Sequence, residues 1–99
     1  MNNRLYKKYG FDSNKNLRKL SYSLILEDYK SCPDCCAETI HKEFIIFVCW
    51  AKGDGISGYI FNKGKAIACV HYYYQEPEKV ILDCKKYIDY IKPLLSSCE

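Results

Sequence analysis

The chain has 99 residues, of which 48% are hydrophobic, 27% charged and 15% aromatic, and its formal net charge is +3. This length suits one domain with a modest core, and these proportions exclude a disordered chain. No apolar run approaches the roughly 20 residues of a membrane span, and no apolar stretch follows the basic N-terminus as in a signal peptide. We therefore expect a single soluble domain over residues 1–99, located in the cytoplasm.

Basic residues are concentrated at the N-terminus. Against one acidic residue, Asp12, residues 1–20 hold six basic side chains: Arg4, Lys7, Lys8, Lys15, Arg18 and Lys19. Residues 1–17 lack a hydrophobic period, so we expect a basic, partly irregular arm. Such an arm can contact nucleic acid or an acidic partner, with Arg4, Lys7 and Lys8 as contact residues. The alternative is a solvated terminus without a partner.

Hydrophobic patterns predict the strands. Apolar side chains alternate over residues 19–29, which indicates a half-buried first strand. The apolar run 44–50 indicates a buried central strand, and 56–61 and 66–74 indicate two more strands joined by short turns that contain glycine. Residues 35–42 are expected to form a short helix or a long loop. The result is an antiparallel sheet of about four strands, the last three forming a meander.

The C-terminal region has the period of an amphipathic helix. Apolar residues recur there at steps of three and four: Val80, Cys84, Ile88, Ile91, Leu95 and Cys98. Pro77 suits the first helical position. Pro93 conflicts with the pattern, so the helix is expected to kink there or to end near Ile91. Packing the apolar stripe on one face of the sheet gives a small two-layer α+β domain.

The seven cysteines are the most distinctive feature of the sequence. Because no export signal accompanies them, we expect thiols in a reducing compartment and not a disulfide framework. Cys32 and Cys35 have the C-x-x-C spacing that turns two sulfurs toward one metal ion, while Cys69 and His71 share a face of a predicted strand. These four residues are the candidate ligands of a structural zinc ion. The alternative is a chain without a cofactor, in which Cys69 is a core residue and His71 lies on the surface.

The segment Cys32-Pro33-Asp34-Cys35 follows a predicted strand and resembles the C-P-x-C element of the thioredoxin and glutaredoxin families. The later order of strand, turn, strand and helix is similar to the end of a thioredoxin domain. The resemblance implies a helix that opens at the motif. It also implies a thiol oxidoreductase in which Cys32 attacks and Cys35 resolves the mixed disulfide. The chain departs from the family because the interval from Cys35 to Phe44 is short and no proline precedes the strand at 56–61.

Aromatic residues near the end of the predicted sheet form the last candidate site. Alternation places Tyr73 on one face of its strand and Tyr72 and Tyr74 on the other. Trp50 and Tyr59 lie on neighbouring predicted strands. Together these five residues predict a contact patch, because Tyr and Trp are enriched in the cores of protein interfaces. The alternative is that the tyrosines simply cover the edge of the sheet.

No motif in the chain names a reaction, so we interpret it as a small non-catalytic protein that binds, and thereby inhibits, a protein partner. The composition, rich in Lys, Ile, Asn and Tyr, is typical of AT-rich genomes, and small proteins of this kind often come from phages, mobile elements or immunity loci. The alternatives are a zinc-stabilised nucleic-acid-binding domain and a thioredoxin-like oxidoreductase. An exposed strand edge would also suit a homodimer.

Overall fold

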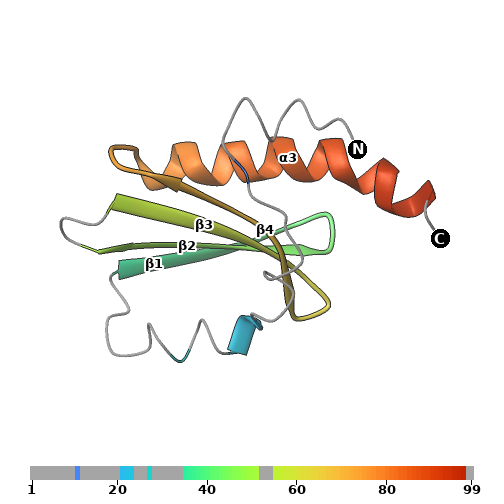
Figure 1. Ribbon diagram of the computed structural model, residues 1–99, viewed down its shortest axis with the longest axis horizontal. Coiled ribbons are helices and arrows are strands. Elements are labelled where there is room, and N and C mark those ends of the chain that lie inside the picture. Colours follow the sequence, from blue (N-terminus) through green and yellow to red (C-terminus); the bar gives the residue numbers. More distant parts are fainter. Residues whose placement is uncertain (1–10, 12–20, 24–26, 28–34, 52–54, 98–99) are drawn as a thin grey trace.

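The computed structural model describes residues 11, 21–23, 27, 35–51 and 55–97. They form a four-stranded antiparallel sheet with one long helix across it (Figure 1). The elements follow one another along the chain as β1 (Cys36–His41), β2 (Phe44–Ala51), β3 (Gly55–Asn62), β4 (Lys65–Tyr72) and α3 (Pro77–Ser97). The strands pair in the order β1-β2-β3-β4, so each strand lies beside its neighbours in the sequence. The predicted α+β class and the meander are confirmed.

The first strand of the sheet is not where the sequence predicted it. β1 occupies the segment that was expected to be a helix or a loop. In the range 19–29, Ser21 makes only an isolated bridge to Lys65, while Tyr22, Ser23 and Glu27 have helical backbone. The described residues of that range therefore do not form a strand of the sheet, and the rest of the range, with Leu20, Leu24 and Leu26, lies outside the described residues.

Two physical reasons explain why the sequence of β1 does not predict a strand. It is an edge strand, and its largest apolar side chain, Ile40, is 68% exposed, so no clear alternation marks a buried face. The turn to β2 consists of Lys42 and Glu43, both with positive φ (50° and 75°). Turns of this kind usually carry Asn or Gly, and neither residue is present here. By contrast, the β3–β4 turn contains a glycine as predicted, and this residue, Gly64, has a positive φ.

One face of the sheet, which we call the helix face, packs on α3. Buried side chains of β2, β3 and β4 meet the apolar stripe of the helix, which includes Val80, Cys84 and Ile88. Gly58 of β3 lies directly beneath the helix, since a Cβ there would stand 2.8 Å from Cγ1 of Val80. The sheet and α3 thus approach each other more closely at Gly58 than a side chain at this position would permit.

Phe11 also belongs to the core, although the arm at residues 1–17 was expected to be irregular. Its ring is fully buried and stacks on Tyr87 of α3, with centroids 4.4 Å apart and planes 11° from parallel. The N-terminal region therefore contributes at least one large side chain to the hydrophobic core. Arg4, Lys7 and Lys8 lie outside the described residues.

The opposite face of the sheet, which we call the second face, has a smaller buried cluster of Phe47, Cys49, Phe61 and Ala66. Tyr22 covers part of it, with edge-on ring contacts to Phe47 and Phe61 at 6.2 and 5.4 Å. The backbone N–H of Tyr22 donates to the carbonyl oxygen of Gly64 (2.9 Å). Both faces of the sheet are therefore at least partly covered.

Helix α3 continues through Pro93 to Ser97, so it does not end at Ile91. Its C-terminal turns deviate from the axis of the preceding turns (Figure 1), as expected where a proline removes a backbone donor. In the part of the chain that the structure describes, no helix combines the length and apolar character needed to cross a membrane.

Two carboxylates of α3 bind opposite edges of the sheet. Asp83 is 1% exposed and accepts hydrogen bonds from the hydroxyl of Tyr72 on β4 (2.8 Å) and from Nζ of Lys79 (3.0 Å). Asp89 lies on the surface and accepts from Nε2 of His41 and Nζ of Lys42, each at 2.8 Å. The hydrogen bonds from Lys42 and then from His41 lower the pKa of the Asp89 carboxyl below its ordinary 3.8.

Candidate functional site

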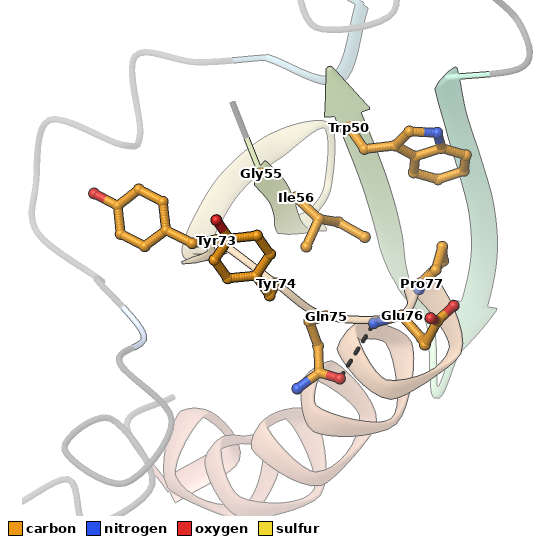
Figure 2. Close-up of a pocket in the computed structure, with 8 residues that line it drawn as sticks. All are labelled: Trp50, Gly55, Ile56, Tyr73, Tyr74, Gln75, Glu76 and Pro77. Carbon is orange, nitrogen blue, oxygen red and sulfur yellow. Dashed lines mark hydrogen bonds between the residues drawn. The ribbon is translucent and has the colours of Figure 1, made fainter. Parts of the chain in front are cut away.

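A groove opens at the end of the sheet where β2 ends, β3 begins and β4 leads into α3. Its volume is about 510 Å³, and eight residues line it: Trp50, Gly55, Ile56, Tyr73, Tyr74, Gln75, Glu76 and Pro77. We call it the aromatic groove. Figure 2 shows Trp50 on one side and the rings of Tyr73 and Tyr74 on the other, with Ile56 between them.

Local backbone requirements explain why these residues meet. Gly55 has a φ of 86°, and a Cβ there would collide with the carbonyl oxygen of Tyr72. Only glycine allows the start of β3 to pass so close to the end of β4. The carbonyl of Glu76 accepts from the N–H groups of Lys79 and Val80 (3.1 and 3.2 Å), and α3 begins at the next residue, Pro77. Residues 73–76 therefore form a short link held at both ends.

The tyrosines of this link are unusually exposed. Tyr73 is 78% and Tyr74 96% exposed, whereas large aromatic rings are normally at least half buried. Trp50 is partly buried, and its ring packs against the core of the helix face. The groove thus combines an anchored indole with two solvent-facing phenol rings, a composition typical of the centre of a protein interface.

The polar groups of the groove are a carboxylate, Glu76, and an amide, Gln75, whose Oε1 accepts from the N–H of Glu76 (3.2 Å). The aromatic faces present negative π-electron density, which attracts a cation placed above them. A carboxylate that lines the same groove as aromatic rings therefore suits an Arg or Lys side chain with apolar neighbours. The chemistry of the groove favours a basic, partly apolar peptide segment.

The structure brings together three of the predicted patch residues and separates two others. Trp50, Tyr73 and Tyr74 line the groove. Tyr72 turns to the helix face, where its hydroxyl donates to Asp83. Tyr59 lies on the second face and stacks on Phe61, with centroids 6.1 Å apart. The ring of Tyr73 meets the ring of His71 edge-on, with centroids 5.3 Å apart.

Three of the four predicted zinc ligands, Cys35, Cys69 and His71, lie among the described residues. Cys35 is disulfide-bonded, so its sulfur is not a thiolate ligand here. Cys69 and His71 lie on β4, and the described part of the chain contains no group of three His, Cys, Asp or Glu side chains arranged to hold a metal ion. Cys32 lies outside the described residues. Zinc binding stays a prediction that a native mass spectrum, recorded before and after a chelator, would test.

The structure also bears on the thioredoxin resemblance. A C-P-x-C element of that family opens a helix, whereas strand β1 begins directly after Cys35. The described sheet is antiparallel throughout, and its strands follow the order of the sequence. The implied helix is therefore absent after the motif.

A row of polar and sulfur-bearing side chains crosses the second face. The pairing register places Cys36 opposite Cys49, Cys49 opposite Ser57, and Ser57 opposite His71. Oγ of Ser57 lies 2.9 Å from Nδ1 of His71. Sequence reasoning missed this row, because its members are far apart in the chain and only the strand register reveals it.

The remaining described thiol, Cys84, has a structural role. It is fully buried beneath the sheet, and a Cβ at Gly58 would stand 3.1 Å from its sulfur. Burial raises its pKa to about 12, and the nearby carboxylate of Asp83 contributes to the rise. Such a thiol is inert at neutral pH, because the thiolate is the reactive form.

Comparison of the chain with protein-family models, with curated proteins and with solved structures found no match. The function must therefore be argued from the site.

Proposed function

We propose that this protein is a non-catalytic binding module that holds a basic, partly apolar segment of a partner protein in the aromatic groove. The observation that carries the proposal is the exposure of Tyr73 and Tyr74 beside Trp50. Keeping two phenol rings in water makes no contribution to the core. An interface gives them a use, because Tyr buries a large area on binding and has few rotatable bonds to order.

The same groove supplies orientation as well as apolar area. Glu76 offers a charged acceptor at the rim, and its place at the start of α3 fixes its backbone. A basic side chain between Glu76 and the tyrosine rings would gain both an ion pair and a cation–π contact. Occupying such a segment of a partner would block its other contacts, which is how an inhibitory protein of a phage, mobile element or immunity locus acts.

The proposal can be tested with a random-peptide display library selected on the immobilised wild-type protein. Enriched peptides should carry Arg or Lys next to apolar residues. The double variant Tyr73→Ala/Tyr74→Ala should bind them at least about tenfold more weakly, the range expected when interface anchors are truncated. Glu76→Gln should weaken binding and make it less sensitive to salt.

Ile40→Ala is the matched control, because Ile40 is a large exposed apolar side chain beside the β1–β2 turn, at the other end of the sheet. It should leave peptide affinity unchanged. The proposal is wrong if the selected peptides bind the double tyrosine variant as tightly as the wild type while both proteins have the same thermal stability.

A further inference from the structure

We propose that Cys36 and Cys49 form a thiol–disulfide exchange site that reacts with low-molecular-weight disulfides such as glutathione disulfide. The two cysteines are directly opposite each other on β1 and β2, and both are thiols in the structure. They lie on the second face, whereas Trp50 of the aromatic groove packs with the core of the helix face. The proposal is therefore independent of the proposed function.

The turn between β1 and β2 determines how close the two sulfurs come. It has two residues, Lys42 and Glu43, both with positive φ, and it is closed by the pair His41–Phe44. In a two-residue turn of this kind the closing pair is hydrogen-bonded, and hydrogen-bonded and non-hydrogen-bonded pairs alternate along antiparallel strands. Cys36–Cys49 is the fifth pair beyond His41–Phe44, so it is a non-hydrogen-bonded pair.

Non-hydrogen-bonded pairs bring the backbones closest. Their Cα atoms are about 4.5 Å apart and their side chains are nearer than in the alternating pairs. Disulfides span Cα separations of about 4.4–6.8 Å. A bond between Cys36 and Cys49 therefore requires no change of strand register. Cys69 provides the contrast, because the residue opposite it is Tyr59 and not a cysteine.

The two thiols differ in access, which assigns their roles. Cys36 is half-buried at the start of an edge strand, whereas Cys49 is 2% exposed within the apolar cluster. The thiolate of Cys36 attacks one sulfur of the small disulfide, forming a mixed disulfide and releasing one small thiolate. The thiolate of Cys49 then attacks the sulfur of Cys36 and releases the second. Two protein thiols are oxidised to one disulfide, one small disulfide is reduced to two thiols, and the two protons pass to the departing thiolates.

The test is incubation of the protein with glutathione disulfide, followed by acid quenching, alkylation of the remaining thiols and tryptic mapping. Trypsin cleaves after Lys30, Lys42 and Lys52, so Cys36 and Cys49 fall on different peptides, 31–42 and 43–52. The expected product joins these peptides through Cys36 and Cys49, and two molecules of glutathione are released per protein. Fragmentation of the linked peptide identifies the sulfurs, since peptide 31–42 also contains Cys32 and Cys35.

Three variants sharpen the result. Cys49→Ser should stop the reaction at the first step, so that Cys36 accumulates as a mixed disulfide with glutathione. Cys36→Ser should abolish the link between peptides 31–42 and 43–52, and Cys69→Ser should leave it intact. The proposal is overturned if peptides 31–42 and 43–52 are still linked in Cys36→Ser. It is also overturned if the wild-type protein releases no glutathione and forms no link between Cys36 and Cys49.

Discussion

Replacing Gly58 by alanine should destabilise the fold, because the added methyl group would push α3 away from the sheet. The new Cβ would stand 2.8 Å from Cγ1 of Val80 and 3.1 Å from Sγ of Cys84, whereas non-bonded carbons prefer about 3.5–4.0 Å. The backbone of β3 and the helix must therefore separate by several tenths of an ångström. Overpacking of this kind costs about 1–3 kcal/mol.

Part of that cost is offset, because alanine loses less conformational entropy than glycine in a strand, by about 0.5–1 kcal/mol. A net loss of about 0.5–2 kcal/mol follows, which for a domain of this size lowers Tm by several degrees. Urea denaturation followed by the fluorescence of Trp50, the single tryptophan, measures it. The cause can be isolated by repeating Gly58→Ala in a Val80→Ala background, where the nearest clashing methyl group is gone and the added cost should fall. Equal costs in the two backgrounds, or a gain in stability from Gly58→Ala alone, would refute the reasoning.

Three further outcomes are expected. Glu43→Gly should raise the free energy of unfolding by about 0.5–1 kcal/mol, because Glu43 has a φ of 75° and glycine adopts this conformation without strain. A lower Tm for the variant in thermal denaturation would contradict the claim that Glu43 is strained in the β1–β2 turn. The lowered pKa of Asp89 means that its contribution to stability is present above about pH 4 and is lost as the pH falls through the folded-state pKa. The wild type should therefore lose more stability than Asp89→Asn between pH 6 and pH 2.5, and parallel pH profiles would argue against this. Cys84, with a pKa of about 12, should resist iodoacetamide at pH 8 in the native protein and react after unfolding in urea, as peptide mass mapping would show; labelling at equal rates in both states would contradict its burial.

Strong hydrophobic periods made β2, β3, β4 and α3 predictable. The run from Phe44 to Trp50 is apolar because both faces of that strand are buried, and the helix stripe is apolar because it meets the sheet. Gly64 marked its turn because glycine relieves a positive φ. In each case a local residue preference and the tertiary structure agree.

β1 could not be predicted because its local signals point elsewhere. Its turn uses Lys42 and Glu43, which the tertiary structure holds at positive φ, with the side chain of Lys42 bound to Asp89 of the helix. Pairing to β2 and this contact with α3 stabilise the strand, and both are long-range features that a local pattern does not carry. The burial of Phe11 escaped notice for the same reason, since a single apolar residue has no period.

The candidate site was predictable in part. Trp50, Tyr73 and Tyr74 stood out by residue type, but the separation of Tyr72 and Tyr59 from them depends on which face each side chain takes. The Cys36–Cys49 pair depends on a register that only the unpredicted strand supplies.

Through two of its carboxylates, α3 is connected to both edge strands of the sheet. Asp83 is tied to β4 at one edge and Asp89 to the β1–β2 turn at the other, while the helix contacts the strands between. Neither edge strand can separate from the sheet without breaking a side-chain contact to α3. Edge strands are usually the first parts of a sheet to open, and they exchange their amide hydrogens at a lower free energy than the core does. Here both edge strands are bound to the same helix. The sheet and the helix should therefore open together as a single cooperative unit.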